Sequence, residues 1–240
     1  MTASEAPRRI GFLAPMKPEL RPLVQMLGLK KRDAGEGPPS YHATFGERSV
    51  VAMLTLIGTK AATEATERLL RDHEIDHVVV VGIAGGVPPA VKLGDVLVPE
   101  VVIDATTGAE FRPAPLGDVP MGGRIRTSDD LTVTVDAMRA QAVTACDMET
   151  ASVAAVCDAQ GRPWTAFRAI SDLVGGPVNE AVLAMANPDG TGNYGAAARY
   201  LLPRPWKLPG LIRLARDTNV ATKAAAAAAI RACDLEPSQR

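Results

Sequence analysis

The chain has 240 residues, of which 47% are hydrophobic and only 4% aromatic, a composition that suits an α/β domain better than an aromatic-rich β-sandwich. The formal net charge of −1 gives no electrostatic reason to expect a nucleic-acid partner. We expect no secretory signal at the start of the chain, and no charge-free apolar stretch is long enough to span a membrane.

The first half of the chain predicts alternating strands and helices. An uninterrupted apolar run predicts a strand buried on both faces, whereas apolar residues three and four apart predict a helix. In chain order, the predicted elements are a strand at 9–14, a helix at 19–27, a polar loop at 30–39, strands at 41–45 and 49–55, and a helix at 60–73.

The second half opens with the strongest strand signal, the run HVVVV at 77–81, which is typical of a central strand. A Gly-rich turn is expected directly after it, at 82–86. The further predicted elements are a strand at 95–102, loops at 105–124, a helix at 147–160, a strand at 164–170, and an Ala-rich helix at 222–233.

This order of elements predicts an α/β fold, a single three-layer α/β/α domain around one central sheet. The core is expected at 9–174, with 175–240 as a C-terminal loop and helical tail packed on the same domain. Ligands of such sheets bind beyond the carboxyl ends of the strands, which directs attention to residues 14–19, 82–86 and 171–172.

The three cysteines, Cys146, Cys157 and Cys233, form no CxxC pair. This argues against a disulfide framework or a zinc site and favours a reducing compartment. A cytoplasmic location is therefore expected.

Each of the three strand ends carries residues with an ordinary structural interpretation. Glu19 can complement the dipole of the helix that it opens, and Asp147, Glu149 and Asp172 can act as helix caps or first-turn acids. The Gly-rich segment lets a ligand approach the backbone, but it lacks the GxGxxG spacing and a following helix, so neither a dinucleotide site nor a P-loop is predicted. A tight turn without a ligand is the competing interpretation of that segment.

Four stretches of the sequence carry a family resemblance. They are IGFLAPMKPEL, LIGTKAA, VVVVGIAGGVPPAVKLGDVLVP and DMETASVAAVCDAQGRPWTAFRAISD. Together they resemble the purine nucleoside phosphorylase/uridine phosphorylase superfamily, in particular the methylthioadenosine/S-adenosylhomocysteine nucleosidases and hopanoid-associated nucleosidase relatives. The match runs in family order over roughly residues 9 to 174 and is thin from 104 to 140. It implies a mixed, twisted central sheet.

The resemblance implies an enzyme that cleaves the N-glycosidic bond of an adenosine-type nucleoside, and it assigns a role to each matching residue. Asp172 would protonate or hydrogen-bond N7 of the purine, and Ser171 would orient it. Glu149 would bind the ribose hydroxyls, with Met148 packed against the sugar. Glu19 would be the general base for the attacking water.

Further residues are implied to line the nucleoside site. Ile83, Ala84 and Gly85 belong to the Gly-rich segment, and Leu131 falls where the nucleosidases place a purine-stacking aromatic. No metal or organic cofactor is implied. Candidate substrates differ in the 5′ substituent: methylthioadenosine, S-adenosylhomocysteine or a lipid-linked adenosine.

Hydrolysis is favoured over phosphorolysis by two departures from the family pattern. Ile83 stands where phosphorolytic and many hydrolytic members carry Ser or Thr, and the stretch APMKPE lacks the Gly-Asp-Pro-x-Arg context of phosphorolytic members. A phosphorylase remains a second hypothesis, with Lys17 as the phosphate cation. A nucleoside-binding protein without catalysis is a third hypothesis, and a lipid-associated structural protein is a fourth.

The resemblance also implies a homo-oligomer, with a dimer favoured. The basic, Pro-containing stretch 201–216 is similar to the tail of the hopanoid-associated relatives and suggests contact with a greasy substrate or a membrane surface. Because prolines break any long amphipathic face, packing on the chain's own domain or on a subunit partner is the favoured interpretation.

Overall fold

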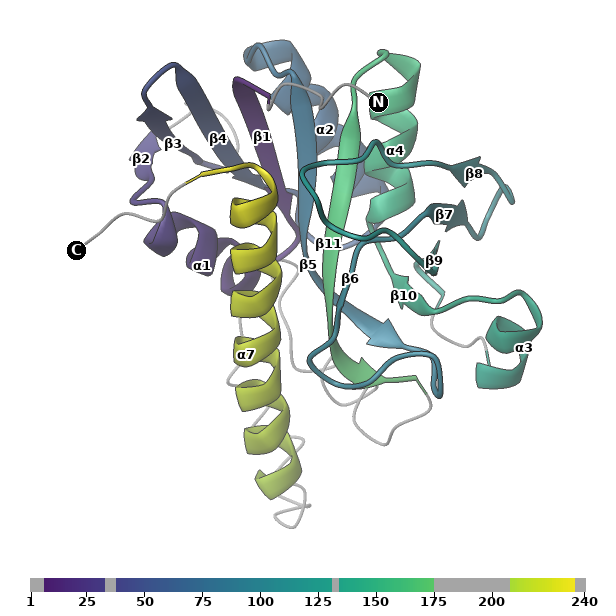
Figure 1. Ribbon diagram of the computed structural model, residues 1–240. Helices are drawn as coiled ribbons and strands as arrows, with labels where there is room; N and C mark the ends of the chain where they lie inside the picture. The colour runs from purple at the N-terminus through teal and green to yellow at the C-terminus, as the bar shows by residue number, and fades with distance from the viewer. Residues whose placement is uncertain (1–6, 33–37, 131–133, 175–207, 236–240) are drawn as a thin grey trace.

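The computed structural model describes residues 7–32, 38–130, 134–174 and 208–235. They form a mixed, twisted sheet with helices on both faces (Figure 1). Helices α1 (Lys17–Met26) and α7 (Leu208–Ala232) pack together on one face, and α2 (Thr59–Asp72) and α4 (Thr150–Ala159) pack together on the other. The predicted α/β class with its layered sheet is confirmed.

The remaining elements complete the sheet and its edge. A short helix, α3, covers Val135–Ala140. The strands of the described residues are β1 (Arg9–Ala14), β2 (Lys30–Arg32), β3 (Ser40–Phe45), β4 (Arg48–Leu54), β5 (His77–Gly86), β6 (Val96–Leu97), β7 (Val101–Asp104), β8 (Glu110–Phe111), β9 (Arg124–Thr127), β10 (Ala145–Asp147) and β11 (Trp164–Leu173).

The central strand of the sheet is β5. It runs parallel to β1 on one side and to β11 on the other, and its last residues pair antiparallel with β10. The strand order is β2-β3-β4-β1-β5-β10-β9-β7-β8, with β11 joined to β5 and β6. Because β1, β5 and β11 are parallel, their carboxyl ends meet at one edge of the sheet, the lower edge in Figure 1.

The Val run of β5 fills the core on both faces of the sheet. Successive side chains of a strand point to opposite faces. Val79 and Val81 accordingly join the hydrophobic cluster under α1 and α7, whereas Val78 and Val80 join the cluster under α2 and α4. All four are fully buried, which explains the absence of polar residues from this run.

Several predicted boundaries are wrong because strand pairing continues past them. The segment 82–86, expected as a turn, is the second half of β5 and pairs with β11 along its length. The strand expected at 95–102 is two short strands, one pairing with β11 and the other with β9. The helix expected from residue 147 begins at Thr150, because Asp147 ends β10 beside β9.

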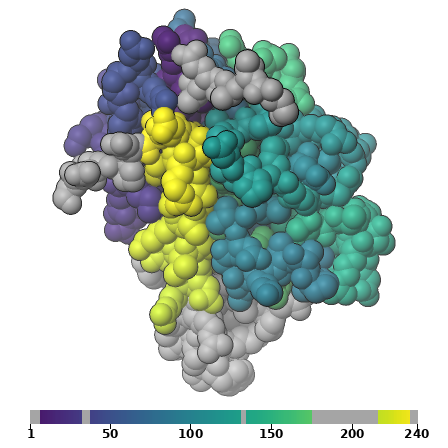
Figure 2. Space-filling model, in the orientation of Figure 1, coloured from purple at the N-terminus to yellow at the C-terminus, as the bar shows by residue number. Residues whose placement is uncertain are grey.

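Helix α7 is longer than the Ala-rich helix expected at 222–233. Its buried Ala225, Ala226 and Ala229 are small enough to let it approach β11, β5 and α1 closely. In Figure 2 it crosses the visible face between the purple N-terminal elements and the teal middle of the chain. Within the described ranges, no helix is both long and apolar enough to cross a membrane.

Part of the tail prediction cannot be compared with the structure. Residues 175–207 lie outside the described residues, and of the stretch 201–216 only the part from residue 208 onward is described, as helix. The domain boundary at 174 and the contacts of this stretch stay predictions.

Candidate functional site

A fully buried arginine lies at the centre of the candidate site. Arg168, in the middle of β11, is surrounded by three buried carboxylates from separate parts of the chain. Its guanidinium lies 2.8 Å from Asp147, 3.3 Å from Glu149 and 4.0 Å from Glu19. Burial alone would lower the pKa of Arg168, but the three carboxylates, Asp147 foremost, hold it above its ordinary value.

Glu19 stands in the first turn of α1 and points inward. Its Oε2 accepts a hydrogen bond from the backbone N–H of Met16 at 2.7 Å, which is the capping interaction expected of an acid at this position. Its Oε1 accepts a second bond, 2.8 Å long, from the N–H of Ile83 in β5. Burial raises the pKa of Glu19 to about 7, although Arg168 opposes the rise.

Glu149 is the residue directly before α4. Its Oε1 accepts from the N–H of Gly58 at 3.1 Å and its Oε2 from Arg168 at 3.3 Å. Burial, assisted by the neighbouring Asp147 and Glu19, raises the pKa of Glu149 to about 8, and Arg168 opposes the rise. Gly58 has φ of 102°, a conformation that favours glycine, and this places its N–H at the carboxylate.

Gly82 separates Glu19 from Arg168. A Cβ at this position would lie 2.4 Å from Oε1 of Glu19 and 2.5 Å from Nη1 of Arg168. The Gly-rich segment therefore brings two of the protein's own charged groups against the strand backbone, and it does so as part of a strand rather than as the expected turn.

Ser171 and Asp172 lie near the end of β11, where the pairing register with β5 shifts. Ser171 is buried and donates a hydrogen bond of 2.7 Å from Oγ to Oδ1 of Asp172, which is half-buried. Cys146 of β10 pairs with the same residue of β5, Gly85, as Asp172 of β11 does. Burial raises the pKa of its thiol to about 12, and the neighbouring Asp147 and Asp172 add to the rise. Asp172 thus lies on the same strand as Arg168, toward its carboxyl end.

The other predicted residues are distributed around the cluster. Met148 is half-buried between Asp147 and Glu149 in sequence, and Ile83 and Gly85 are half-buried in β5. Ala84 is buried in the hydrophobic core under α2 and α4, so its side chain is a packing residue. Lys17, the candidate phosphate cation, is exposed at the start of α1, and Leu131 lies outside the described residues.

The sequence interpretation gave no role to Arg168 and Gly58, and only a capping role to Asp147. A signal for Arg168 was present: one arginine interrupts an otherwise apolar strand, WTAFRAISD, and a buried charge requires partners. Those partners come from α1, β10 and the start of α4, so no spacing in the sequence identifies them.

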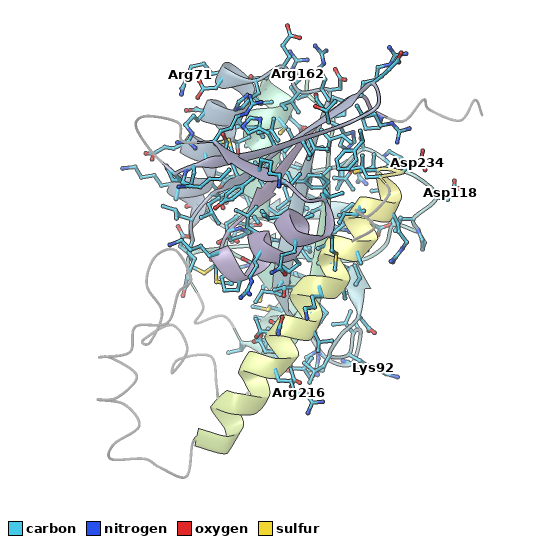
Figure 3. All side chains as sticks on the ribbon, turned by 90° about the vertical axis from the view of Figure 1, so that its left-hand side faces the viewer. Arg71, Lys92, Asp118, Arg162, Arg216 and Asp234 are labelled. Carbon is cyan, nitrogen blue, oxygen red and sulfur yellow. The ribbon has the colours of Figure 1, made fainter. Side chains whose placement is uncertain are left out.

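A second polar region lies at the opposite edge of the sheet. Arg9, Arg71, His73 and Arg162 line a shallow hollow at the amino ends of β1 and β5. Figure 3 shows Arg71 and Arg162 at one end of the molecule and Lys92 and Arg216 at the other. Arg71 lies in the last turn of α2, where a helix C-terminus attracts cations, and Arg9 is paired with Asp76. The helix end accounts for Arg71, and ion pairing accounts for Arg9.

Comparison with known proteins identifies relatives of the chain. A family model described as the phosphorylase superfamily matches residues 9–121 and 121–197. A 5′-methylthioadenosine/S-adenosylhomocysteine nucleosidase of a Shewanella species is 28% identical over 199 residues, covering 68% of this chain and 84% of that protein. The corresponding nucleosidase of Shewanella oneidensis is 26% identical over 197 residues, covering 68% of this chain and 84% of that protein.

Solved structures share the fold. The nucleosidase of the same name from Helicobacter pylori, in complex with a substituted pyrrolidin-3-ol, has a TM-score of 0.70 at 16% identity and covers 96% of this chain and 99% of its own. Futalosine hydrolase of Helicobacter pylori has a TM-score of 0.70 at 17% identity, with coverages of 95% and 97%. The nucleosidase of Colwellia psychrerythraea, in complex with adenine, has a TM-score of 0.69 at 19% identity, with coverages of 98% and 98%. This likeness confirms the predicted nucleoside phosphorylase-like fold.

Proposed function

This chain belongs to the phosphorylase superfamily, and we propose that it is a purine nucleosidase, an N-ribosyl hydrolase that releases the purine of an adenosine-type nucleoside. The observation that carries the proposal is the buried cluster of Glu19, Glu149 and Arg168, with the half-buried Asp172 farther along the same strand as Arg168. The matched nucleosidases of Shewanella support the same reaction class.

The chemistry requires three kinds of group. The N-glycosidic bond breaks through an oxocarbenium-like sugar while the departing purine accumulates negative charge. An acid near the purine, a base for the attacking water and a ligand for the ribose hydroxyls are therefore needed.

We assign the role of general base for the attacking water to Glu19. Its pKa of about 7 matches a group that must accept a proton near neutral pH, because a general base works best when its pKa is close to the working pH. Its two bonds from Met16 and Ile83 hold the carboxylate in one orientation, and each oxygen has a second lone pair left for a water molecule.

We assign binding of the ribose to Glu149 and Met148. A carboxylate can accept hydrogen bonds from two vicinal hydroxyls, which selects a ribo-sugar over a deoxy-sugar. The bonds from Gly58 and Arg168 fix the carboxylate in advance of binding, and the half-buried Met148 offers an apolar surface for the sugar face.

We assign contact with the departing purine to Asp172, oriented by Ser171. The hydroxyl of Ser171 donates to Oδ1 of Asp172, and this bond orients the carboxyl group for N7 of a purine. A Cβ at Gly85 would lie 3.2 Å from Sγ of Cys146 and 3.7 Å from Oδ2 of Asp172, so glycine lets the strand backbone approach both groups closely.

Hydrolysis fits the charge of the site better than phosphorolysis does. Three buried carboxyl groups already surround the guanidinium of Arg168, so this cation is committed to the protein's own acids and is not placed to bind a phosphate dianion. A phosphorylase using Lys17 remains the second candidate, because Lys17 is exposed in the same helical turn as Glu19 and its cation can approach an anion from solvent.

The finer features of the function are part of the same proposal. The substrate is an adenosine with a 5′ substituent, of which methylthioadenosine, S-adenosylhomocysteine and a lipid-linked adenosine are the candidates. The chain acts in the cytoplasm as a homodimer.

The test is a base-release assay on these nucleosides in buffer with and without phosphate. We expect free adenine in phosphate-free buffer and an unphosphorylated ribose product. Strict dependence on phosphate, with ribose 1-phosphate as product, would establish the phosphorylase instead. Tight nucleoside binding without base release would establish a binding protein.

A further inference from the structure

We propose that Asp147 is a positioning residue for this site. It holds Arg168 between Glu19 and Glu149, and it limits how strongly the positive charge of the arginine stabilises the ionised form of either glutamate. The inference deepens the proposed function and rests on it for its kinetic consequences. Asp147 acts through Arg168 and has no assigned contact with substrate.

The geometry that carries the inference is the convergence of donors on Asp147. Oδ1 accepts from the hydroxyl of Thr127 at 2.6 Å and from the N–H of Thr150 at 3.3 Å. Oδ2 accepts from the hydroxyl of Thr150 and from Nη2 of Arg168, the latter at 2.8 Å. Asp147 is only 7% exposed, so these four donors fix both oxygens of the carboxylate.

Arg168 is held by the same group of residues. Its Nε and Nη2 both donate to the hydroxyl of Thr150, at 3.1 and 2.9 Å, and this hydroxyl in turn donates to Asp147. The guanidinium is thus tied to the junction of β10 and α4 by Asp147 and Thr150. Among its three carboxylates, Asp147 is the closest and Glu19 the most distant.

The consequence concerns the charge at the two glutamates. With its positive charge turned mainly to Asp147, Arg168 offsets the burial of Glu19 and Glu149 only in part, and the negative charge of Asp147 acts on both directly. Removing that charge would let Arg168 stabilise the ionised glutamates more strongly.

Other groups near the cluster differ in how directly they act. Four charged side chains face one another: Glu19 from α1, Asp147 from β10, Glu149 from the start of α4 and Arg168 from β11. Two backbone N–H groups complete the cluster, that of Ile83 in β5 and that of Gly58 before α2. Farther out, Cys146 interacts electrostatically with Asp147, Asp172 and Arg126.

The test compares neutral and charged replacements at residue 147. We expect Asp147→Asn and Asp147→Ser to move the acidic limb of the kcat/KM–pH profile to lower pH by about one unit, since loss of a neighbouring like charge lowers a carboxyl pKa by this order. Asp147→Glu, which keeps the charge, should leave the limb near its original pH. Thr127→Val, which keeps the charge but loosens the carboxylate, should lower kcat several-fold without moving the limb.

The matched control is Asp76→Asn. Asp76 also accepts hydrogen bonds from an arginine, Arg9, but at the opposite edge of the sheet, so its replacement should leave the pH profile unchanged. Circular dichroism verifies folding of each variant. An acidic limb that stays in place in a folded neutral variant, or a Thr127→Val enzyme with unchanged kcat, would overturn the inference.

A second readout does not depend on catalysis. Carboxyl ¹³C NMR titration of the glutamates, assigned with Glu19→Gln and Glu149→Gln, reports their ionisation directly. We expect both signals to titrate at lower pH in Asp147→Asn than in the parent protein. If no nucleoside is cleaved but this shift is observed, the proposed function fails and the role of Asp147 stands; if bases are released but no shift is observed, the reverse holds.

Discussion

The carboxylate of Glu19 and the guanidinium of Arg168 approach to 4.0 Å across the backbone of Gly82. Both side chains are buried, and each is held by other partners. The site is therefore organised before any ligand binds, which is the condition for efficient electrostatic catalysis.

Gly82→Ala should disrupt this arrangement. The new methyl group would overlap Glu19 and Arg168, so we expect a loss of about 1–3 kcal/mol in the free energy of unfolding together with most of the activity. Gly122→Ala is the control, because no atom lies within 4 Å of a Cβ at that position. Urea denaturation of both variants is the measurement; equal stability of the two would contradict the described packing.

Stability should depend on pH through the buried glutamates. Their pKa values of about 7 and about 8 in the folded state exceed the ordinary value of 4.5, so the folded protein binds more protons than the unfolded chain between these limits. The free energy of unfolding should consequently fall as the pH rises from about 5 to about 8. Glu19→Gln should reduce this slope, and urea titrations at several pH values measure it. A slope identical to that of the parent protein would rule out the linkage.

Glu19→Gln should also abolish most turnover while substrate still binds. The amide cannot accept the proton of water, whereas Glu149 still binds the ribose and Asp172 still binds the purine. Calorimetry with a nucleoside and a base-release assay separate the two effects. Glu64→Gln, on the exposed surface of α2, is the matched control. Undiminished turnover in the Glu19 variant would show that Glu19 is not the general base.

Asp172→Asn should lower turnover by at least about two orders of magnitude, the usual contribution of a positioned acid. Ser171→Ala should have a smaller effect, because it removes only the hydrogen bond that orients Asp172. Asp118→Asn, at the surface site labelled in Figure 3, serves as control. Single-turnover kinetics report the chemical step, and near-normal rates in a folded Asp172 variant would reject the assignment.

The proposed homodimer is open to a direct check. Light scattering at micromolar concentration should give about twice the monomer mass of 25.2 kDa. A single species of monomer mass over that concentration range would contradict it.

The sequence alone predicted much of the fold. The unbroken apolar run of β5 and the amphipathic spacing of α1 are local patterns, and local periodicity determines whether a segment becomes strand or helix. Glu19, Glu149 and Asp172 stand at strand ends and helix starts, where an acid has an ordinary structural explanation, and their roles as candidates were implied by the family resemblance. Family membership followed from four ordered stretches, and the family model confirms it.

Only the tertiary structure decided how these residues act on one another. Arg168 is separated from Glu19 by 149 residues of chain (168 − 19), and their proximity depends on the pairing of β11 with β5 and on the packing of α1. Because of the same pairing, the expected glycine turn is part of a strand. The pairing also explains the glycine at position 82, where a side chain would overlap Glu19 and Arg168. Long-range contacts of this kind leave no periodic signal in the sequence, because each partner satisfies its own local pattern whether or not the other is present.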